Sequence, residues 1–370
     1  MTDFKKSILM ITSRADYGGG PEHIYLLIKN ISAEYKIFIA APDDKPYWKR
    51  FSLIVDKSAM IKIPHRKFRI RSIAELRTFI IKNNIDIIHS HGKGAGIYGR
   101  CLSMIINKPC IHTFHGVHKG EYNIVSKYLY IALEKFLSCF TYRFISVSKS
   151  EAAKIKEIGL SGKKIEIIPN GIEIPTERIN DKVFEQNILR ILTVTRFDYA
   201  KNTGLIINIF DSLLRLNPTK IFHFDIIGSG ELESAVKMEI ENYNWKHLIH
   251  FHGFQNNLTK FYLNAFCYLS TSRWEGLPLS LMEAMSFGVP AVVSEVAGNC
   301  DLVDETCGFL YNLGEPETAA QRILELSEDR NLWSKFSSAS FEKISRNFTI
   351  QNSVNRTLNL YLTLKNTGVN

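Results

Sequence analysis

The chain has 370 residues, more than one hydrophobic core usually serves, so we expect two domains. Hydrophobic residues make up 45% and charged residues 22% of the sequence, as in an ordinary globular protein. No apolar run approaches the ~18 residues that a membrane span needs, and we expect no secretory signal. The six cysteines form no Cys-x-x-Cys pair, so we expect neither a zinc site nor a disulfide framework, in a reducing cytoplasm.

The net charge of +9 is concentrated in the first half of the chain. Residues 1–172 carry 28 Lys and Arg against 14 Asp and Glu, whereas residues 173–370 carry 18 against 23. A one-sided positive field predicts an anionic partner, either a membrane surface, a nucleic acid or an acidic substrate. Nothing in the sequence resembles a nucleic-acid-binding module, so we expect no nucleic acid partner.

The first half alternates short apolar strands with helical segments, which is the pattern of a doubly wound α/β domain. A strand over residues 7–12 is followed by Gly18, Gly19 and Gly20 and then by a helix with Pro21 in its first turn. Consecutive glycines let a ligand approach the backbone closely, but they also occur in flexible turns without a ligand. Further strands are predicted at 36–41, 85–91, 109–116 and 142–148.

Two segments of the first half have an unusual composition. Residues 62–71 hold five Lys or Arg interleaved with apolar residues, which predicts a membrane or anionic-acceptor patch or, more often, a solvated loop. Residues 122–140 form an apolar helical stripe too broad for a typical surface helix. We expect that stripe to be buried in the core; a membrane-facing groove is the alternative.

Four histidines follow or end the predicted strands of the first half, namely His89, His91, His112 and His115. Ligands of open α/β sheets bind beyond the carboxyl ends of the strands, so each of the four is a candidate. A lone histidine in such a place is more often a hydrogen-bonded structural residue than a catalyst.

The second half repeats the alternation after residues 173–187, a polar and strand-poor segment that we interpret as a linker. Arg196 and Lys201 lie at a strand-to-helix turn, where they can converge on a diphosphate or remain ordinary surface cations. Gly228 begins a Gly-x-Gly turn after another strand. Glu233 stands where a dinucleotide fingerprint needs its third glycine, so NAD binding is disfavoured.

The most informative stretch runs from Thr271 to Pro290 and holds Glu275 and Glu283 with seven residues between them. Pro278 suits a first helical turn and Gly288 a left-handed stop, so the stretch predicts a loop followed by a helix. The first N–H groups of a helix attract phosphate. The two carboxylates are either acids favoured by the helix dipole or acceptors for hydroxyls flanking a diphosphate, as in a nucleotide sugar.

This stretch resembles the Glu-x7-Glu motif of the retaining glycosyltransferases of family 4, including its Glu-Gly-Leu-Pro-Leu-Ser-Leu-Met-Glu-Ala-Met core. Pro169-Asn-Gly-Ile172 and Cys307-Gly-Phe-Leu310 are also similar to that family. The resemblance covers nearly the whole chain and implies a GT-B architecture, with two Rossmann-like doubly wound parallel-sheet domains facing across a cleft. It implies an acceptor domain over 1–172, a linker over 173–187, a nucleotide-sugar domain over 188–345, and a helix over 346–370 that crosses back.

The resemblance also implies roles for individual residues. The proposed catalytic pair is His115, which matches the family's donor-sugar histidine in Thr113-Phe-His-Gly116, and Glu275 beside the donor sugar; His91 assists. The implied substrate-binding residues are Gly18, Gly19, Gly20, Arg196, Lys201, Gly228, Phe254, Gly276, Leu277, Leu279 and Glu283. Arg196 and Lys201 stay in register although Thr195 replaces the family's glycine, and Glu283 holds the donor ribose.

The implied activity is retaining transfer of a sugar from a UDP-sugar to a lipid-linked or polysaccharide acceptor in cell-surface glycan synthesis, without metal or cofactor. With the basic first half, this predicts a cytoplasmic protein on the inner face of the plasma membrane. Two alternatives remain: a sugar-nucleotide epimerase of the same fold, and a non-catalytic partner subunit.

Overall fold

The computed structural model describes residues 6–31, 35–116, 124–217 and 220–364. Its internal contacts divide the chain into two compact units. The first unit comprises Met1–Gly171 together with Ile350–Asn370, and the second comprises Ile172–Thr349. None of the helices in the described residues is long and apolar enough to cross a membrane.

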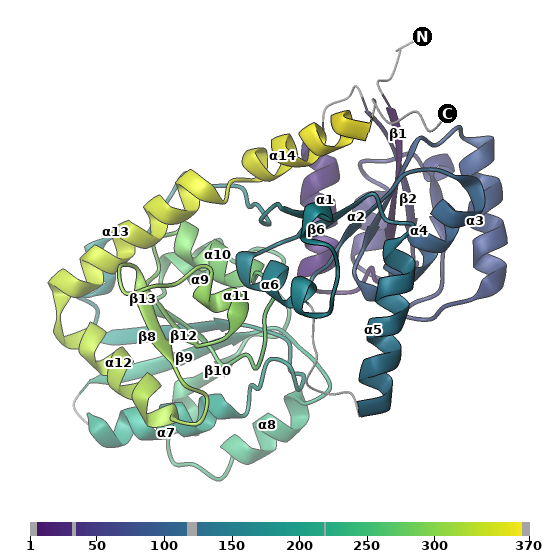
Figure 1. The fold of residues 1–370 in the computed structure, drawn as a ribbon. Coiled ribbons are helices and arrows are strands. Elements are labelled where there is room, and N and C mark those ends of the chain that lie inside the picture. The colour runs from purple at the N-terminus through teal and green to yellow at the C-terminus, as the bar shows by residue number, and fades with distance from the viewer. Residues whose placement is uncertain (1–5, 32–34, 117–123, 218–219, 365–370) are drawn as a thin grey trace. The chain divides into compact units, whose positions relative to one another are not determined.

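The first unit is built on one parallel sheet of seven strands (Figure 1). Its strands are β1 (Lys6–Thr12), β2 (Tyr35–Ala41), β3 (Met60–Lys62), β4 (Ile87–His91), β5 (Cys110–Thr113), β6 (Arg143–Ser146) and β7 (Ile165–Ile167). They lie in the order β3-β2-β1-β4-β5-β6-β7, and every neighbouring pair is parallel. Because the strand order reverses between β1 and β4, the carboxyl ends of these two strands form the switch point of the sheet, where α/β folds bind ligands.

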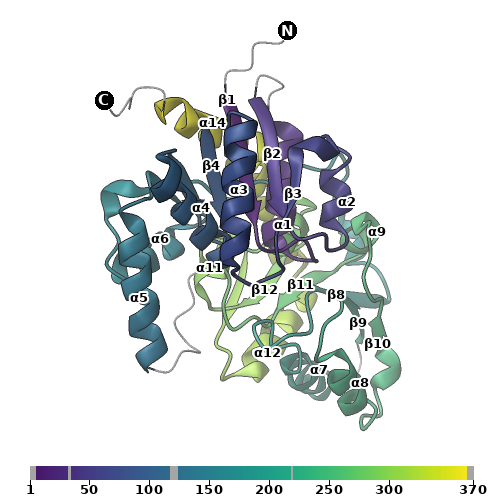
Figure 2. The same cartoon turned by 90° about the vertical axis from the view of Figure 1, so that its right-hand side faces the viewer.

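Helices cover both faces of this sheet. They are α1 (Gly19–Asn30), α2 (Tyr47–Phe51), α3 (Ile70–Lys82), α4 (Lys93–Ile106), α5 (Ile124–Ser138), α6 (Lys149–Glu157) and α14 (Ile350–Thr363). Helix α4 packs on β1, β4 and β5 with α3 beside it (Figure 2), whereas α1 packs against α14 and α2. Both faces of the sheet are therefore shielded from water.

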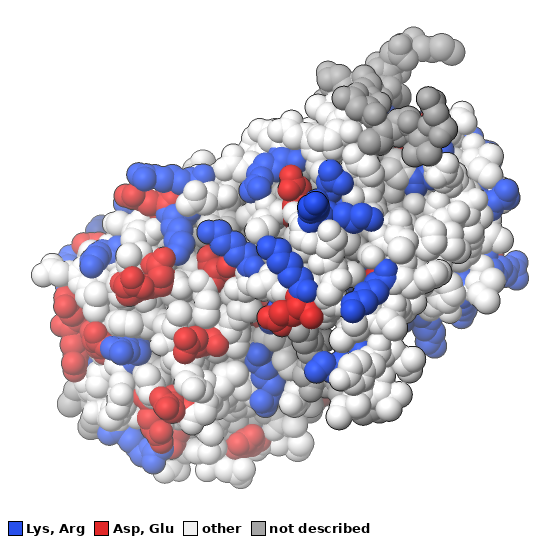
Figure 3. All heavy atoms as spheres, in the orientation of Figure 1, with Lys and Arg blue, Asp and Glu red and all other residues white. Residues whose placement is uncertain are grey.

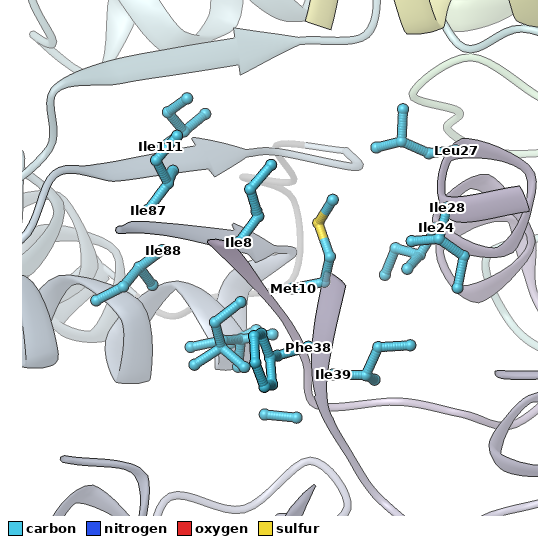
Figure 4. Packing of buried hydrophobic residues seen from close by; sticks show 14 of the residues in the cluster. Ile8, Met10, Ile24, Leu27, Ile28, Phe38, Ile39, Ile87, Ile88 and Ile111 are labelled. Carbon is cyan, nitrogen blue, oxygen red and sulfur yellow. The ribbon is translucent and has the colours of Figure 1, made fainter. Parts of the chain in front are cut away.

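The strands are largely apolar because a parallel sheet is buried on both faces. Side chains of Ile87 and Ile88 point to opposite sides of β4 (Figure 4), as the pleat of a strand requires. Ile8 and Met10 of β1 and Phe38 of β2 belong to the same buried cluster. This core fixes the positions of the strand ends that carry the candidate site.

Helix α14 returns to the first unit after the chain has completed the second. Its Tyr361 is fully buried, and the hydroxyl lies 2.6 Å from Nδ1 of His89 in β4. The ammonium of Lys6 donates to the carbonyl of Tyr361 at 3.2 Å. The first unit thus contains residues from both ends of the chain.

The second unit has a parallel sheet of six strands in the order β10-β9-β8-β11-β12-β13. The strands are β8 (Ile188–Val194), β9 (Ile221–Ile227), β10 (Ile249–Phe251), β11 (Cys267–Ser270), β12 (Ala291–Ser294) and β13 (Gly308–Tyr311). The helices are α7 (Leu205–Leu216), α8 (Glu233–Ile240), α9 (Thr259–Leu263), α10 (Leu279–Ser286), α11 (Ala297–Cys300), α12 (Pro316–Glu328) and α13 (Arg330–Asn347). Its switch point lies between β8 and β11.

Residues 173–187, interpreted from the sequence as a linker, belong to the second unit. Ile179 and Val183 in this segment are buried, and the N–H of Ile179 donates to the carbonyl of Phe287 at 2.9 Å. A short 3₁₀ turn covers Asp181–Val183. Buried apolar side chains hold this polar segment on the surface of the second unit.

The apolar segment 122–140 differs from our expectation of a buried helix. Residues 117–123 lie outside the described part of the chain, and α5 follows them. Six large apolar side chains of α5 are exposed to between 38% and 74%. The periodicity predicted the helix correctly, but its exposed side is largely apolar, whereas its buried residues are Glu134 and Leu137.

Candidate functional site

The candidate site of the second unit lies at the carboxyl ends of β8 and β11, which flank the switch point. Arg196 and Lys201 lie in the segment that follows β8, and Glu275 lies in the loop between β11 and α10. Because β8 and β11 are adjacent in the sheet, these two loops are neighbours in space although some 70 residues separate them.

An ion pair joins the two loops. Nζ of Lys201 lies 2.5 Å from Oε1 of Glu275, and the Ser272 hydroxyl donates to the same carboxylate oxygen at 2.6 Å. Thr271 Oγ1 donates to the Lys201 carbonyl at 2.9 Å, so the backbones are tied as well as the side chains. The Lys201 and Glu275 side chains are only 19% and 11% exposed. The structure therefore places a cation and an anion in fixed contact at the switch point.

Arg196 is oriented by an acid that the sequence did not single out. Its guanidinium lies 2.8 Å from Oδ2 of Asp198, and the other oxygen of Asp198 accepts from the N–H of Lys201 at 3.0 Å. A single aspartate thus connects the two cations. The spacing of Asp198, two residues from Arg196 and three from Lys201, is the only signal in the sequence for this role.

Gly228 supports this turn from β9. It has φ of +129°, and a Cβ atom at this position would lie 1.7 Å from the Thr195 carbonyl oxygen. A Cβ on Gly230 would lie 2.4 Å from the carbonyl oxygen of Phe197. The Gly-x-Gly turn therefore lets the backbone beside Arg196 approach β9 closely, which is a packing role in addition to the substrate-binding role predicted for Gly228.

Helix α10 begins at Leu279 with Pro278 at its N-cap, one residue later than the prolyl first turn that the sequence predicted. Gly288 has φ of +80°, as expected for the residue that ends such a helix. Gly276 lies in the loop before the helix, where its carbonyl faces Gly298 at the start of α11; a Cβ on Gly298 would lie 2.6 Å from that oxygen. Leu277 and Leu279 are buried, so their side chains are not exposed to a ligand.

Glu283 lies on the second turn of α10 and is half-buried. Its Oε2 accepts a hydrogen bond of 2.8 Å from the hydroxyl of Tyr262, a buried residue that the sequence did not indicate. Burial, reinforced by the charge of Glu283, holds the pKa of Tyr262 well above its usual value, so Tyr262 stays a donor. This contact fixes one oxygen of the Glu283 carboxylate.

Phe254 follows Gly253, which has φ of +61°, in the turn after β10. The Phe254 side chain is 41% exposed. Nearby, His252 Nε2 lies 2.6 Å from Oδ1 of Asp225. The other carboxylate oxygen of Asp225, Oδ2, lies 3.1 Å from the guanidinium of Arg190. The turn is thus anchored to β9 while Phe254 keeps an accessible ring.

The first unit gathers histidines at its own switch point. His91 ends β4 and His115 follows β5, and Nδ1 of His91 lies 3.4 Å from Nε2 of His115. His23 of α1 packs edge-on against His115 with ring centroids 5.1 Å apart. Gly20 adjoins this group, since its Cβ would lie 3.9 Å from Cδ2 of His115.

The remaining two histidines have partners that account for them structurally. His89 contacts Tyr361 and, at 2.7 Å, Thr113 Oγ1, and His112 Nδ1 lies 3.0 Å from Ser90 Oγ. Of the four candidates, the structure therefore sets His91 and His115 together beside the glycine loop. Gly18 precedes α1 as its N-cap, and Gly19 and Gly20 are its first residues.

Burial keeps the imidazoles of this cluster neutral. It lowers the pKa of His23 to about 4 and that of His115 well below 6.5, and the neighbouring histidines act in the same direction on His115. Nδ1 of His23 and Nε2 of His91 are buried and have no hydrogen-bond partner within the described residues. Neutral imidazoles with unused ring nitrogens can donate to or accept from the hydroxyl groups of a ligand.

Two groups of described side chains have the composition of metal ligands. The ligand atoms of His23, His91 and His115 lie within 4.8 Å of one another, and so do those of Asp16, Asp44 and His65. In the second group the acids are engaged by Arg14 and His65. Both groups belong to the first unit.

Two Rossmann-like units, each a parallel sheet with polar residues at its switch point, are the architecture of the GT-B glycosyltransferases. Residues 176–343 match the family model described as glycosyl transferases group 1, and residues 17–174 match the one described as Glycosyltransferase Family 4. The chain is a GT-B glycosyltransferase.

Curated relatives and solved structures agree with this class. The chain is 28% identical over 308 residues, 79% of each chain, to the UDP-Gal:alpha-D-GlcNAc-diphosphoundecaprenol alpha-1,3-galactosyltransferase of Escherichia coli. It is 28% identical to the E. coli O-antigen biosynthesis glycosyltransferase WbnH, over 81% of this chain and 84% of that one. The crystal structure of Anabaena HepE in complex with UDP-glucose has the same fold, with a TM-score of 0.83 and 16% identity, over 97% of this chain and 100% of that one.

Proposed function

We propose that this protein transfers a sugar from a UDP-sugar to a lipid-linked acceptor during synthesis of an O-antigen or related cell-surface polysaccharide. The observation that carries the proposal is the set of Arg196, Lys201, Glu275 and Glu283 on the two loops and the helix at the β8–β11 switch point. The UDP-galactose and diphosphoundecaprenol in the name of the E. coli relative support the donor and acceptor classes.

In this proposal the second unit binds the donor. Arg196 and Lys201 stabilise the charge that develops on the diphosphate leaving group, together with the N–H groups of Gly276, Leu277 and Leu279. Glu283 accepts from the ribose hydroxyls, and Glu275 from the donor sugar. Phe254 lies beside the nucleobase. Lys201 then exchanges part of its contact with Glu275 for the phosphate.

The first unit contributes neutral imidazoles. His115, assisted by His91, orients the donor sugar through its hydroxyl groups, and the backbone of Gly18, Gly19 and Gly20 allows the substrate to approach. A neutral imidazole suits this task because it hydrogen-bonds a hydroxyl without placing a positive charge beside the forming oxocarbenium ion.

The reaction retains the anomeric configuration. The bond from the anomeric carbon to the UDP oxygen breaks, and the acceptor hydroxyl bonds to the same face of that carbon. No pair of catalytic carboxylates like that of the glycoside hydrolases is assigned here. The acceptor hydroxyl therefore gives its proton to the departing phosphate oxygen. Arg196 and Lys201 supply the positive charge that a metal ion would otherwise supply, so the proposed reaction needs neither metal nor cofactor.

Binding of the donor is tested first by thermal unfolding with UDP, GDP, ADP and their common sugars, because a ligand of the folded state raises the apparent stability. We expect stabilisation by UDP and a UDP-sugar, and its loss in Glu283→Ala. Arg196→Ala is expected to weaken donor binding, and Arg215→Ala, a variant of an exposed arginine on α7, serves as its matched control. No stabilisation by any nucleotide would contradict the proposal.

Transfer is tested by UDP release from UDP-galactose, UDP-glucose and UDP-N-acetylglucosamine, with and without a diphosphoundecaprenol-linked acceptor. Release that requires acceptor supports a transferase, and conversion of the donor without acceptor indicates the epimerase alternative. NMR of the product gives the anomeric configuration, and inversion would reject retention. Unchanged turnover in EDTA is expected; a loss restored by a divalent cation would reject the metal-free reaction.

A further inference from the structure

The feature that the proposed function leaves unexplained is the outer face of α5. We define the α5 face as the six exposed apolar residues of this helix, namely Ile124, Val125, Tyr128, Leu129, Leu133 and Phe136. At 100° per residue these positions share one side of the helix. Monomeric soluble proteins rarely expose a contiguous apolar surface of this kind without a partner for it.

The orientation of α5 is fixed from its inner side. Glu134 is buried there and forms a bidentate ion pair with the buried Arg100 of α4, with N–O distances of 2.6 and 3.1 Å. Ile131 packs against the cluster that includes Ile155 of α6. Rotating α5 to bury its apolar side would break a buried ion pair, so the apolar face points outward in the folded unit.

The surroundings of the α5 face are basic. Lys127 and Lys135 lie on the helix itself, Lys93 lies 4.3 Å from the ring centroid of Tyr130, and Lys164 donates to the carbonyl of Ser138 at 2.8 Å. Residues 124–164 hold eight Lys or Arg and three Glu, two of which, Glu134 and Glu151, are buried. Figure 3 shows blue side chains beside the largely white surface of α5.

An apolar centre with a cationic rim is the composition of an element that inserts into an anionic lipid surface. A second copy of this chain would bring two cationic rims together, which disfavours self-association through this face. The basic run 62–71 is a weaker candidate, because Lys62 pairs with Asp43 at 2.7 Å and Arg71 with Glu75 at 3.0 Å.

We propose that the α5 face docks this protein onto an anionic membrane surface by inserting its apolar side chains between the lipids. The proposal rests on the proposed function in one respect: a lipid-linked acceptor lies in such a surface. Docking itself involves no residue of the donor site. The proposal assigns the membrane contact to α5, whereas the sequence had offered the basic run 62–71 as a further candidate.

The test uses the full chain and flotation with vesicles of phosphatidylcholine alone or mixed with phosphatidylglycerol. The probe variant is Leu129→Gln/Phe136→Gln, since glutamine is a good helix former and both side chains are exposed. We expect binding to the mixed vesicles and at least about a tenfold loss in the variant. The control Ile81→Gln, an equally exposed apolar residue on α3, is expected to bind as the unchanged chain does.

Equal vesicle binding by the α5 variant and the unchanged chain would overturn the proposal. A dimer in analytical ultracentrifugation that dissociates in the variant would also overturn it, by identifying a second copy as the partner. UDP-dependent thermal stabilisation is measured on the same samples. If stabilisation by UDP is absent while vesicle binding depends on α5, the proposed donor is rejected and the docking surface is kept. If UDP stabilises the protein while vesicle binding does not depend on α5, only the docking surface is rejected.

Discussion

Lys201 and Glu275 form a contact in which each residue holds the other at the switch point. The pair is mostly shielded from water, and Ser272 and Thr271 restrain it further. Contacts of this kind keep an arrangement ready before the ligand arrives, which reduces the reorganisation needed during the reaction.

Lys201→Gln is expected to lower kcat/KM by about a hundredfold or more, because a charge that stabilises the leaving group is lost. Steady-state kinetics with the UDP-sugar measures the effect. Lys237→Gln, which disrupts the exposed Lys237–Glu233 pair of α8, is the matched control and is expected to leave kcat/KM unchanged. Equal activity of Lys201→Gln and the control would remove Lys201 from the donor site.

Gly228 gives a prediction from geometry alone. Gly228→Ala is expected to cost several kcal/mol of stability, since the new Cβ would collide with the Thr195 carbonyl and φ of +129° is strained for alanine. Gly204→Ala is the control: its Cβ would have no heavy atom within 4 Å, and its φ is −59°. Chemical denaturation measures both variants. A Gly228→Ala chain as stable as Gly204→Ala would contradict the close approach.

At the scale of elements, the ion pair of Arg100 and Glu134 joins α4 to α5. Glu134→Gln is expected to lower the free energy of unfolding by about 3–5 kcal/mol, because it leaves the guanidinium of Arg100 buried without its counter-charge. The double variant Arg100→Met/Glu134→Leu is expected to recover most of that loss. Glu75→Gln on α3, which breaks an exposed pair with Arg71, should change stability by less than about 1 kcal/mol.

Urea unfolding monitored by circular dichroism checks these three variants. A Glu134→Gln chain with the stability of Glu75→Gln would show that α5 is not held by this pair. The orientation of the α5 face would then lose its support.

The elements themselves were predictable where one local pattern decides them. Strands β1 and β2 appear within one residue of their predicted bounds, because continuous apolar runs bounded by glycine or polar residues have few alternatives. The orientation of α5 was not predictable, and our expectation was wrong. Periodicity shows that a helix has an apolar side, whereas the direction of that side depends on Glu134 meeting Arg100, 34 residues away.

The same distinction applies to the site. Arg196, Lys201 and Glu275 were identified from motifs, because each lies next to a strand end in the sequence. Asp198 and Tyr262 were missed, since an aspartate in a turn and a tyrosine in a short helix have no distinctive pattern; only the folded chain shows their contacts with Arg196 and Glu283. Residues such as Asp198 and Tyr262, which position a site residue, are therefore recognised only from the three-dimensional structure.

At the scale of the whole molecule, the histidine cluster makes stability depend on pH. Burial lowers the pKa of His23 to about 4 and of His89 to about 3, whereas both have values near 6.5 in the unfolded chain. The unfolded chain therefore binds more protons as the pH falls below 6.5. Stability is complete above pH 6.5 and is lost progressively toward pH 4, by a few kcal/mol for each such group.

We expect the melting temperature to decrease as the pH is lowered from 7 to 5. The decrease is expected to be less steep in His89→Asn, which removes one of the titrating groups. Differential scanning fluorimetry across this range measures the slopes. His247→Asn, on the surface of the second unit, is the control and is expected to keep the original slope. Identical slopes for all three chains would place the acid sensitivity elsewhere.

The return of α14 to the first unit has a consequence for how the protein is made on the ribosome. Tyr361, which covers His89, is translated only after the 178 residues of the second unit. At roughly 5–20 residues per second, the first unit waits some ten to forty seconds for its last helix. During that interval the nascent chain exposes the apolar surface that Val354, Leu360 and Tyr361 later cover.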